Sequence, residues 1–245
     1  MFERVKQHWK GIVFSICLFL VLIIVGMYVY LKVSTYEAMP EAAILLDDDR
    51  VKTENDVIIV EPEKPIGNIV FYQGGLVETE AYLPLAKELS GEGFKVFIPV
   101  MPINLAITDS NVFEDIYKDY SSDLPWYIGG HSLGGTSALI YAEEHLEQLQ
   151  GVLLLASYPS KSVDISSSEL SVLSITASND QILNQDNFLE SKSLLPDDTE
   201  YQIIKGGNHS NFGYYGHQKG DGESEITRKE QQEAVVDLFI ENIER

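Results

Sequence analysis

Gly130-His131-Ser132-Leu133-Gly134-Gly135 decides the fold, because this stretch lies between a strand-like run and a helix-like run. Residues 126–128 predict a short buried strand, and residues 136–145 place apolar side chains at helical spacing. A serine with glycine two residues before it and two after it is typical of a nucleophile elbow, a tight turn that projects the hydroxyl outward. We therefore predict Ser132 as a nucleophile and Gly130 and Gly134 as the elbow glycines; the plain alternative is an ordinary glycine-rich turn.

A nucleophilic serine needs a histidine to take its proton and a carboxylate to orient that histidine. After a nucleophile elbow the acid comes first and the histidine second, each just past the carboxyl end of a strand. The strand-like run 170–177 leads into Asp180, and the run 201–204 leads into His209. These two residues are the predicted partners of Ser132.

Three other residues compete for these roles. His217 lies further along, in a Gly- and Tyr-rich loop, as a surface or pocket-rim residue would. Asp164 and Asp186 are more simply explained as a solvated loop residue or a helix cap. The sequence favours Asp180 and His209 and leaves these alternatives open.

A tetrahedral intermediate needs two preorganised N–H donors for its oxyanion. We expect one to be the backbone N–H of Leu133, the residue after the nucleophile. The second is expected from the turn after the strand-like run 68–72, at Leu76 or Gly75. The alternative is a plain glycine turn after a core strand.

The motifs resemble the α/β-hydrolase superfamily, within it the lidless, dienelactone-hydrolase-like branch described as a fold-5 hydrolase domain. The resemblance runs from about residue 56 to the C-terminus and is carried by residues 72–82, the elbow and residues 206–213. It implies a mostly parallel central sheet with helices on both faces. Dienelactone hydrolases use cysteine where this chain has Ser132, so their substrate is not implied. Many members have histidine where this chain has Gln73.

The pattern along the chain agrees with that fold. Predicted strands alternate with helices, which indicates a mostly parallel sheet covered on both faces. These strands lie near residues 57–60, 68–72, 95–100, 126–128, 151–155, 170–177 and 200–204. Only residues 157–169 separate two core strands where many lipases insert a lid, so we expect no large lid and an open site. Residues 213–222, with Tyr214 and Tyr215, are expected to form either a pocket wall or a packed surface loop.

The N-terminus predicts a membrane anchor. Residues 11–31 contain no charged side chain, and as a helix this segment would span about 31 Å, the thickness of a bilayer core. A cleaved signal peptide and a buried core helix are the alternatives. Basic residues precede the segment and acidic ones follow, which puts the N-terminus in the cytoplasm and the domain outside. The predicted organisation is a cytoplasmic N-terminus (1–10), a transmembrane anchor (11–31), a stalk (32–55) and an α/β-hydrolase domain (56–245).

The excess of acidic residues limits the partners that the chain can bind. Of the 17 Lys and Arg and 38 Asp and Glu residues of the chain, 13 and 37 follow residue 32. So acidic a surface disfavours nucleic acid as a partner. The sequence predicts a membrane-anchored, extracytoplasmic serine hydrolase of carboxylic esters, without metal or organic cofactor, acting on small-molecule or surface-displayed esters. An acyltransferase, an amide or peptide hydrolase and a non-catalytic tethered binding domain are the alternatives.

Overall fold

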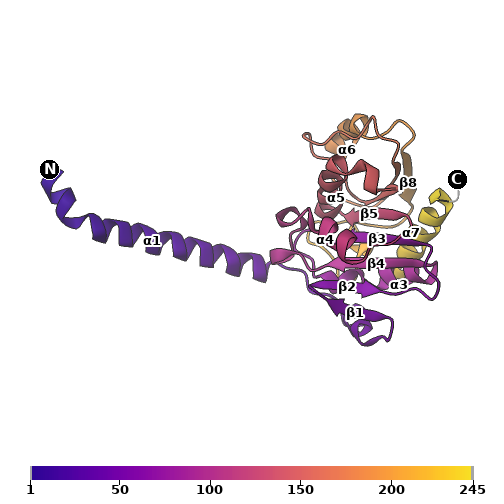
Figure 1. Cartoon of the computed structure of the whole chain (residues 1–245), viewed down its shortest axis with the longest axis horizontal. Helices are drawn as coiled ribbons and strands as arrows, with labels where there is room; N and C mark the ends of the chain where they lie inside the picture. The colour runs from indigo at the N-terminus through magenta and orange to yellow at the C-terminus, as the bar shows by residue number, and fades with distance from the viewer. Residues whose placement is uncertain (1, 244–245) are drawn as a thin grey trace. The chain divides into compact units, whose positions relative to one another are not determined.

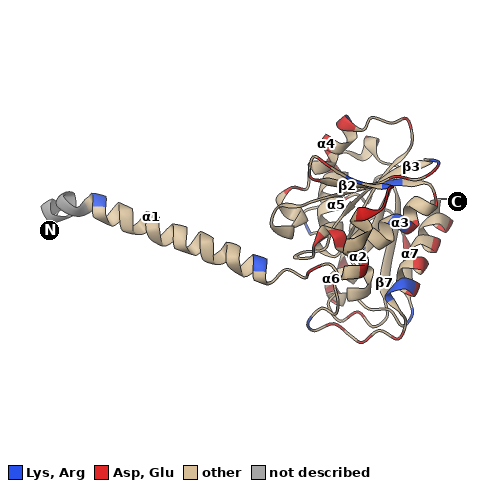
Figure 2. Ribbon diagram, turned by 90° about the horizontal axis from the view of Figure 1, so that it is seen from below, with Lys and Arg blue, Asp and Glu red and all other residues tan. Residues whose placement is uncertain are grey.

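The computed structural model describes the backbone of residues 2–243 and the side chains of residues 9–243 (Figure 1). The chain divides into two units, Met1–Thr35 and Tyr36–Arg245. The first unit is one long helix, α1 (Phe2–Val33). Its segment Trp9–Val33 is long and apolar enough to cross a membrane, and its most apolar 18-residue window has a mean hydropathy of 3.0. Figure 2 shows that no Asp, Glu, Lys or Arg lies in this helix between its two basic residues coloured blue, Lys10 and Lys32. The structure thus confirms one helix that is long and apolar enough to span a membrane, and its orientation stays a prediction.

The second unit is built around an eight-stranded sheet in the order β1-β2-β4-β3-β5-β6-β7-β8. Strands β1 and β2, and β2 and β4, pair antiparallel, and all remaining pairs are parallel. The strands are β1 (Val51–Glu54), β2 (Val57–Val60), β3 (Gly67–Tyr72), β4 (Phe94–Pro99), β5 (Trp126–His131), β6 (Gly151–Leu155), β7 (Ser171–Ala177) and β8 (Glu200–Ile204). The predicted α/β fold with a mostly parallel sheet is confirmed.

Helices cover both faces of this sheet (Figure 1). Helices α3 and α7 pack on one face, and α4 and α5 pack on the other. The helices of the second unit are α2 (Pro40–Ala43), α3 (Leu83–Gly91), α4 (Val112–Asp119), α5 (Leu133–Glu144), α6 (Gln185–Ser191) and α7 (Arg228–Ile243). Residues 156–170, between β6 and β7, contain no helix.

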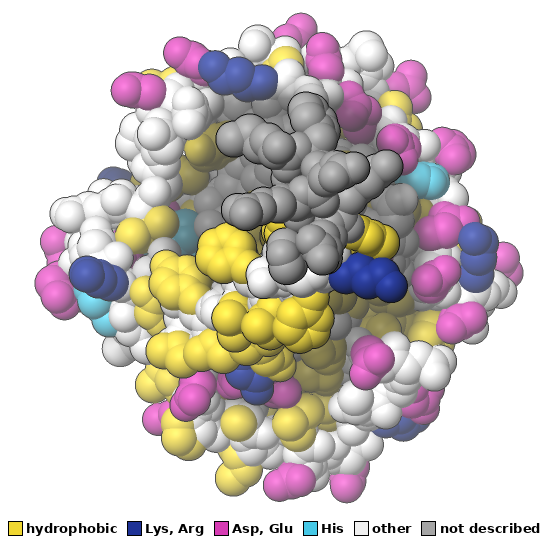
Figure 3. Space-filling view, turned by 90° about the vertical axis from the view of Figure 1, so that its left-hand side faces the viewer, with side chains coloured by type: hydrophobic (Ala, Val, Ile, Leu, Met, Phe, Trp, Pro, Cys, Tyr) yellow, Lys and Arg dark blue, Asp and Glu magenta, His cyan; other side chains and the backbone are white. Residues whose placement is uncertain are grey.

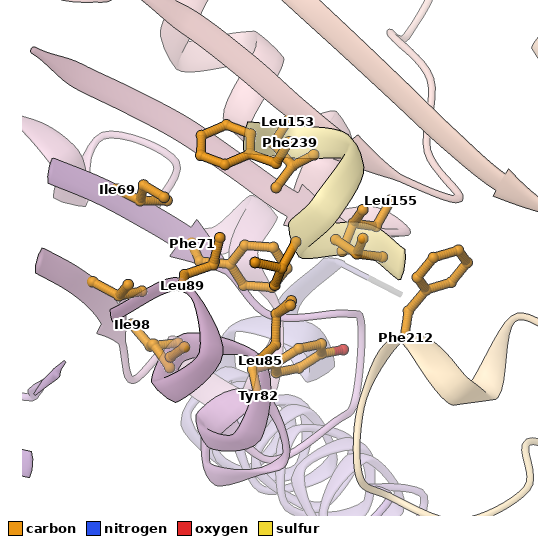
Figure 4. Packing of buried hydrophobic residues seen from close by; sticks show 14 of the residues in the cluster. Ile69, Phe71, Tyr82, Leu85, Leu89, Ile98, Leu153, Leu155, Phe212 and Phe239 are labelled. Atoms are coloured by element: carbon orange, nitrogen blue, oxygen red, sulfur yellow. The ribbon is translucent and has the colours of Figure 1, made fainter. Parts of the chain in front are cut away.

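Two apolar cores follow from the alternation of side chains along the strands. In β3, Ile69 and Phe71 face α3 and α7, whereas Val70 and Tyr72 face the other layer. Figure 4 shows the first core, where side chains of β3, β6, α3 and α7 interdigitate. Because both faces are covered, the central strands are apolar at nearly every position, which explains why they are readable in the sequence.

The structure corrects the predicted stalk. Residues 36–54 belong to the compact unit, which begins at residue 36 instead of residue 56. Ala42 is completely buried, Val51 begins β1, and Tyr36 forms a parallel bridge with Val77. The segment is held by contacts with residues distant in the sequence. Such contacts produce no regular pattern of apolar residues, which is why the sequence suggested a stalk.

Acidic residues outnumber basic ones after residue 32. Figure 3 shows Asp and Glu side chains around the outline of the molecule, with few Lys and Arg between them. The face shown is therefore acidic, as the composition predicts.

Candidate active site

Ser132 occupies the turn between β5 and α5 in a rare backbone conformation, with φ 52° and ψ −121°. A non-glycine residue is held there only when its surroundings determine it. The Ser132 N–H donates to the carbonyl oxygen of Leu155 at 2.9 Å, and the Ser132 carbonyl accepts the Ser157 hydroxyl at 2.7 Å. The strained turn leaves the Ser132 side chain partly exposed.

The two predicted elbow glycines lie where no side chain fits. A Cβ on Gly134 would overlap the carbonyl oxygens of Tyr72 and Gln73, at the end of β3. A Cβ on Gly130 would lie 2.5 Å from the backbone of Gly134. The close approach of α5 to β3 and β5 therefore requires glycine at both positions.

Asp180 and His209 come together at the carboxyl ends of β7 and β8. Nδ1 of His209 lies 2.8 Å from Oδ2 of Asp180, and both side chains are at most 1% exposed. Oδ1 of Asp180 accepts the N–H groups of Ile182 and Leu183, each at 2.8 Å. The carboxylate is thus held by its own loop and directed at the imidazole, which leaves Nε2 of His209 as the atom that can take a proton.

His209 also lies beside the elbow. Its ring centroid is 4.5 Å from that of His131, the residue before Ser132. Nε2 of His209 is buried and has no hydrogen-bond partner among the described residues. It therefore forms no hydrogen bond with the Ser132 hydroxyl in this structure. Catalytic hydrogen bonds are often long without substrate and close when it binds.

The competing candidates lie outside this arrangement. The side chains of His217, Asp164 and Asp186 are exposed, and none of them forms a hydrogen bond with His209 in the described part of the chain. Of the three candidate acids, Asp180 is therefore the one that contacts His209.

The two candidates for the second oxyanion donor differ in their hydrogen bonds. The N–H of Leu76 donates to the carbonyl oxygen of Asn104 at 2.7 Å and is therefore occupied. The N–H of Gly75 has no partner within the described residues, nor has that of Leu133 at the first position of α5. A Cβ on Gly75 would lie 3.1 Å from Cδ2 of Leu133, so the two residues are in contact. The geometry favours Gly75 over Leu76.

Comparison with known proteins identifies the family. A family model described as the alpha/beta hydrolase family matches residues 68–233. This chain belongs to the alpha/beta hydrolase family.

Solved structures of other hydrolases share its fold. A CIB-like hydrolase from Thermoplasma acidophilum superimposes with a TM-score of 0.60 at 15% identity, over 77% of this chain and 97% of that one. Est1E from Butyrivibrio proteoclasticus gives 0.55 at 13% identity, over 77% and 94%. A dienelactone hydrolase from Anabaena variabilis gives 0.56 at 16% identity, over 76% and 90%. The comparison with curated proteins gave no match.

In this alpha/beta hydrolase, Gln73 braces the turn that carries the predicted oxyanion donor. The side chain of Gln73 is completely buried. Its Nε2 donates to the carbonyl of Val77 at 2.7 Å and to Oδ1 of Asn104 at 3.0 Å, and its Oε1 accepts the Thr79 hydroxyl. Gln73 therefore fixes the turn that carries Gly75 from within.

A second buried carboxylate, which the sequence did not single out, joins the two loops of the site. Asp221 accepts hydrogen bonds from the N–H groups of Gln181 at 3.3 Å and His209 at 3.4 Å. It also accepts the N–H of Ser210 at 2.8 Å. Its position within the Gly- and Tyr-rich loop 213–222 gave no signal in the sequence, because its partners are backbone groups that any residue offers. Asp221 therefore joins the loop of Asp180 to the loop of His209.

His131 is a neutral neighbour of the predicted base. Its Nδ1 lies 2.9 Å from the Tyr82 hydroxyl, which accepts the N–H of Gly74 at 2.9 Å. Burial, and then the nearby His209, hold the pKa of His131 well below its usual value of 6.5. A buried neutral ring supports His209 without competing for its proton.

One pocket of about 470 Å³ lies beside the loop after β6. That loop adjoins the elbow, because the Tyr158 carbonyl accepts the Thr136 hydroxyl at 2.8 Å and the Thr136 N–H donates to Ser132. The residues lining the pocket are Tyr158, Pro159, Ser160, Lys161, Asn187, Glu190, Ser191, Ser193 and Leu194. No group of three or more His, Cys, Asp or Glu side chains among the described residues could hold a metal ion.

Proposed function

We propose that this alpha/beta hydrolase is a membrane-anchored serine hydrolase that cleaves carboxylic esters outside the cytoplasmic membrane. The observation that carries the proposal is the buried hydrogen bond of 2.8 Å between His209 and Asp180, next to a strained serine elbow. A binding domain would need none of these three residues in this arrangement. The Lys and Arg residues before the apolar segment support the outward orientation.

The reaction would begin with attack of the Ser132 hydroxyl oxygen on the ester carbonyl carbon. Nε2 of His209 takes the hydroxyl proton. Asp180 accepts a hydrogen bond from Nδ1–H of His209 and stabilises the imidazolium. The carbonyl oxygen becomes an oxyanion, which receives the N–H groups of Gly75 and Leu133. The amino-terminal end of α5 adds a positive dipole at the same place.

Collapse of this intermediate would release the alcohol, which takes the proton from His209, and leave an acyl group on Ser132. Water then attacks the acyl-enzyme and gives its proton to His209. The second tetrahedral intermediate releases the carboxylic acid, and the proton returns to Ser132. No metal or redox partner is needed at any step.

Covalent labelling by a fluorophosphonate probe tests the proposal on the full chain in detergent. We expect labelling of the wild type and none of Ser132→Ala or His209→Ala. His217→Ala is the matched control, because that exposed histidine lies outside the arrangement, and it should label like the wild type. A folded wild type that neither labels nor hydrolyses p-nitrophenyl acetate would overturn the proposal.

A further inference from the structure

The segment that follows the apolar helix pairs directly with the oxyanion turn. The N–H of Tyr36 donates to the carbonyl oxygen of Leu76 at 2.7 Å. The N–H of Glu78 donates back to the Tyr36 carbonyl at 3.0 Å, and its carboxylate accepts the N–H of Ala38 at 2.8 Å. Leu76 follows Gly75, so this pairing holds Tyr36 close to the candidate oxyanion donor.

The same segment is fixed to the loop that follows His209. The N–H of Met39 donates to the Tyr214 carbonyl at 2.7 Å, and the Tyr36 hydroxyl accepts the N–H of Lys219 at 3.2 Å. The rings of Tyr36 and Tyr215 lie 5.6 Å apart. Residues 36–39 are therefore attached to both loops that flank the predicted serine.

Chain connectivity limits how far this attachment can lie from the end of the apolar helix. Helix α1 ends at Val33, three residues before Tyr36. Three residues span at most about 11 Å when fully extended. If α1 crosses the bilayer, as the proposed function holds, the oxyanion turn is kept near the membrane surface whatever the orientation of the two units.

Exposed apolar side chains occur on the segment that supports the same turn. We call Val100, Ile103 and Ile107 the apolar rim; their exposed fractions are 43%, 41% and 45%. Between them lies Asn104, whose carbonyl accepts the N–H of Leu76 at 2.7 Å. Ile103 has a φ of 50°, a conformation that β-branched residues rarely adopt. Apolar side chains beside a membrane surface partition into its interface.

We propose that the apolar rim inserts into the membrane that anchors the chain and that the substrate is a lipid ester resident in that membrane. This inference rests on the proposed function and assigns its substrate class. The acidic surface of the domain repels anionic headgroups, so the lipid is neutral or zwitterionic. The short tether brings the serine to esters that diffuse in the bilayer plane.

The full chain reconstituted in phosphatidylcholine vesicles tests this. Hydrolysis of dioleoylglycerol in the vesicles is measured against hydrolysis of water-soluble p-nitrophenyl acetate. We expect the ratio of the two rates to fall at least fivefold in the double variant Ile103→Ser, Ile107→Ser. The control is Leu189→Ser, Ile203→Ser, which removes apolar side chains that are 60% and 64% exposed on α6 and β8. Its ratio should equal that of the wild type.

A second variant tests the tether without touching the rim. Insertion of a flexible 20-residue Gly-Ser linker between Ser34 and Thr35 should lower the same ratio, because the site is released from the surface. A wild type that hydrolyses p-nitrophenyl acetate but neither dioleoylglycerol nor the phosphatidylcholine of the vesicles would overturn this inference and leave the proposed function standing. Equal ratios in the rim variant, the linker variant and the control would do the same. A folded wild type inactive on both esters would overturn both proposals.

Discussion

Asp221 binds Ser210 twice through one carboxylate oxygen: Oδ2 accepts the backbone N–H at 2.8 Å and the hydroxyl at 2.5 Å. The other oxygen accepts the N–H of Gln181, the residue after Asp180. One buried carboxylate therefore joins the loop of the predicted acid to the loop of the predicted base. We expect the distance between Asp180 and His209 to depend on this connection.

Replacement of Asp221 by asparagine should slow catalysis without weakening substrate binding. The amide places an N–H₂ group against backbone donors, so the two loops lose part of their common anchor. A displacement of about 1 Å at a catalytic group can cost about 100-fold in rate. We expect kcat for p-nitrophenyl acetate to fall roughly 10- to 100-fold, with KM within about threefold.

Asp186→Asn is the control for this prediction. Asp186 is exposed on α6, and its charge is removed in the same way. The control should retain wild-type kcat. An increase of KM at unchanged kcat in Asp221→Asn would assign Asp221 to substrate binding and contradict a positioning role.

The neutral His131 predicts a dependence of stability on pH. Its pKa lies well below 6.5 in the folded chain and near 6.5 in the unfolded chain, so only the unfolded chain takes up this proton as the pH drops below about 6.5. The free energy of unfolding must then decrease through that range. His131→Asn removes the titrating group and keeps an acceptor for the Tyr82 hydroxyl. Below pH 6.5, the Tm of the wild type should fall more steeply than that of the variant; parallel slopes would contradict a neutral buried His131.

The elbow glycines predict a contrast in stability between two substitutions to alanine. Gly134→Ala forces a methyl group against the carbonyl oxygens of Tyr72 and Gln73. Overpacking of this kind costs about 1–3 kcal/mol or more. Gly91→Ala, at the end of α3, meets no atom within 4 Å and should be neutral or slightly stabilising. Urea denaturation of both variants checks this, and equal midpoints would mean that the elbow tolerates a side chain.

Local pattern was enough to predict most of the fold. The central strands are apolar runs bounded by turns. The strands predicted near residues 57–60, 151–155 and 200–204 have these bounds in the structure, although the last is an edge strand. The strand predicted at residues 126–128 extends to His131 in the structure. The predicted strand was shorter because the glycines that follow Ile128 are typical of a turn. Asp180 and His209 were placed by their positions after strands, and the structure brings them together.

Contacts between distant residues account for what the sequence left undetermined. Leu76 and Gly75 were equivalent candidates, and only the bond from Leu76 to Asn104 distinguishes them. Asp221 has backbone partners 11 and 40 positions away, at Ser210 and Gln181. Such bonds leave no periodic signal, so no local pattern could have identified them.

The position of the domain boundary gives the last prediction. Residues 36–54 cover the β2 edge of the sheet through β1 and bury Ala42, whereas a stalk would contribute nothing to folding. A chain that begins at Ser34 should therefore unfold cooperatively, and a chain that begins at Asp56 should have a Tm lower by about 5 °C or more, since loss of even a few buried apolar side chains costs several kcal/mol. The second chain also exposes the unpaired edge of β2, which should promote aggregation. Calorimetry and light scattering on both chains check this. Equal Tm values would restore residues 36–55 to the role of a stalk.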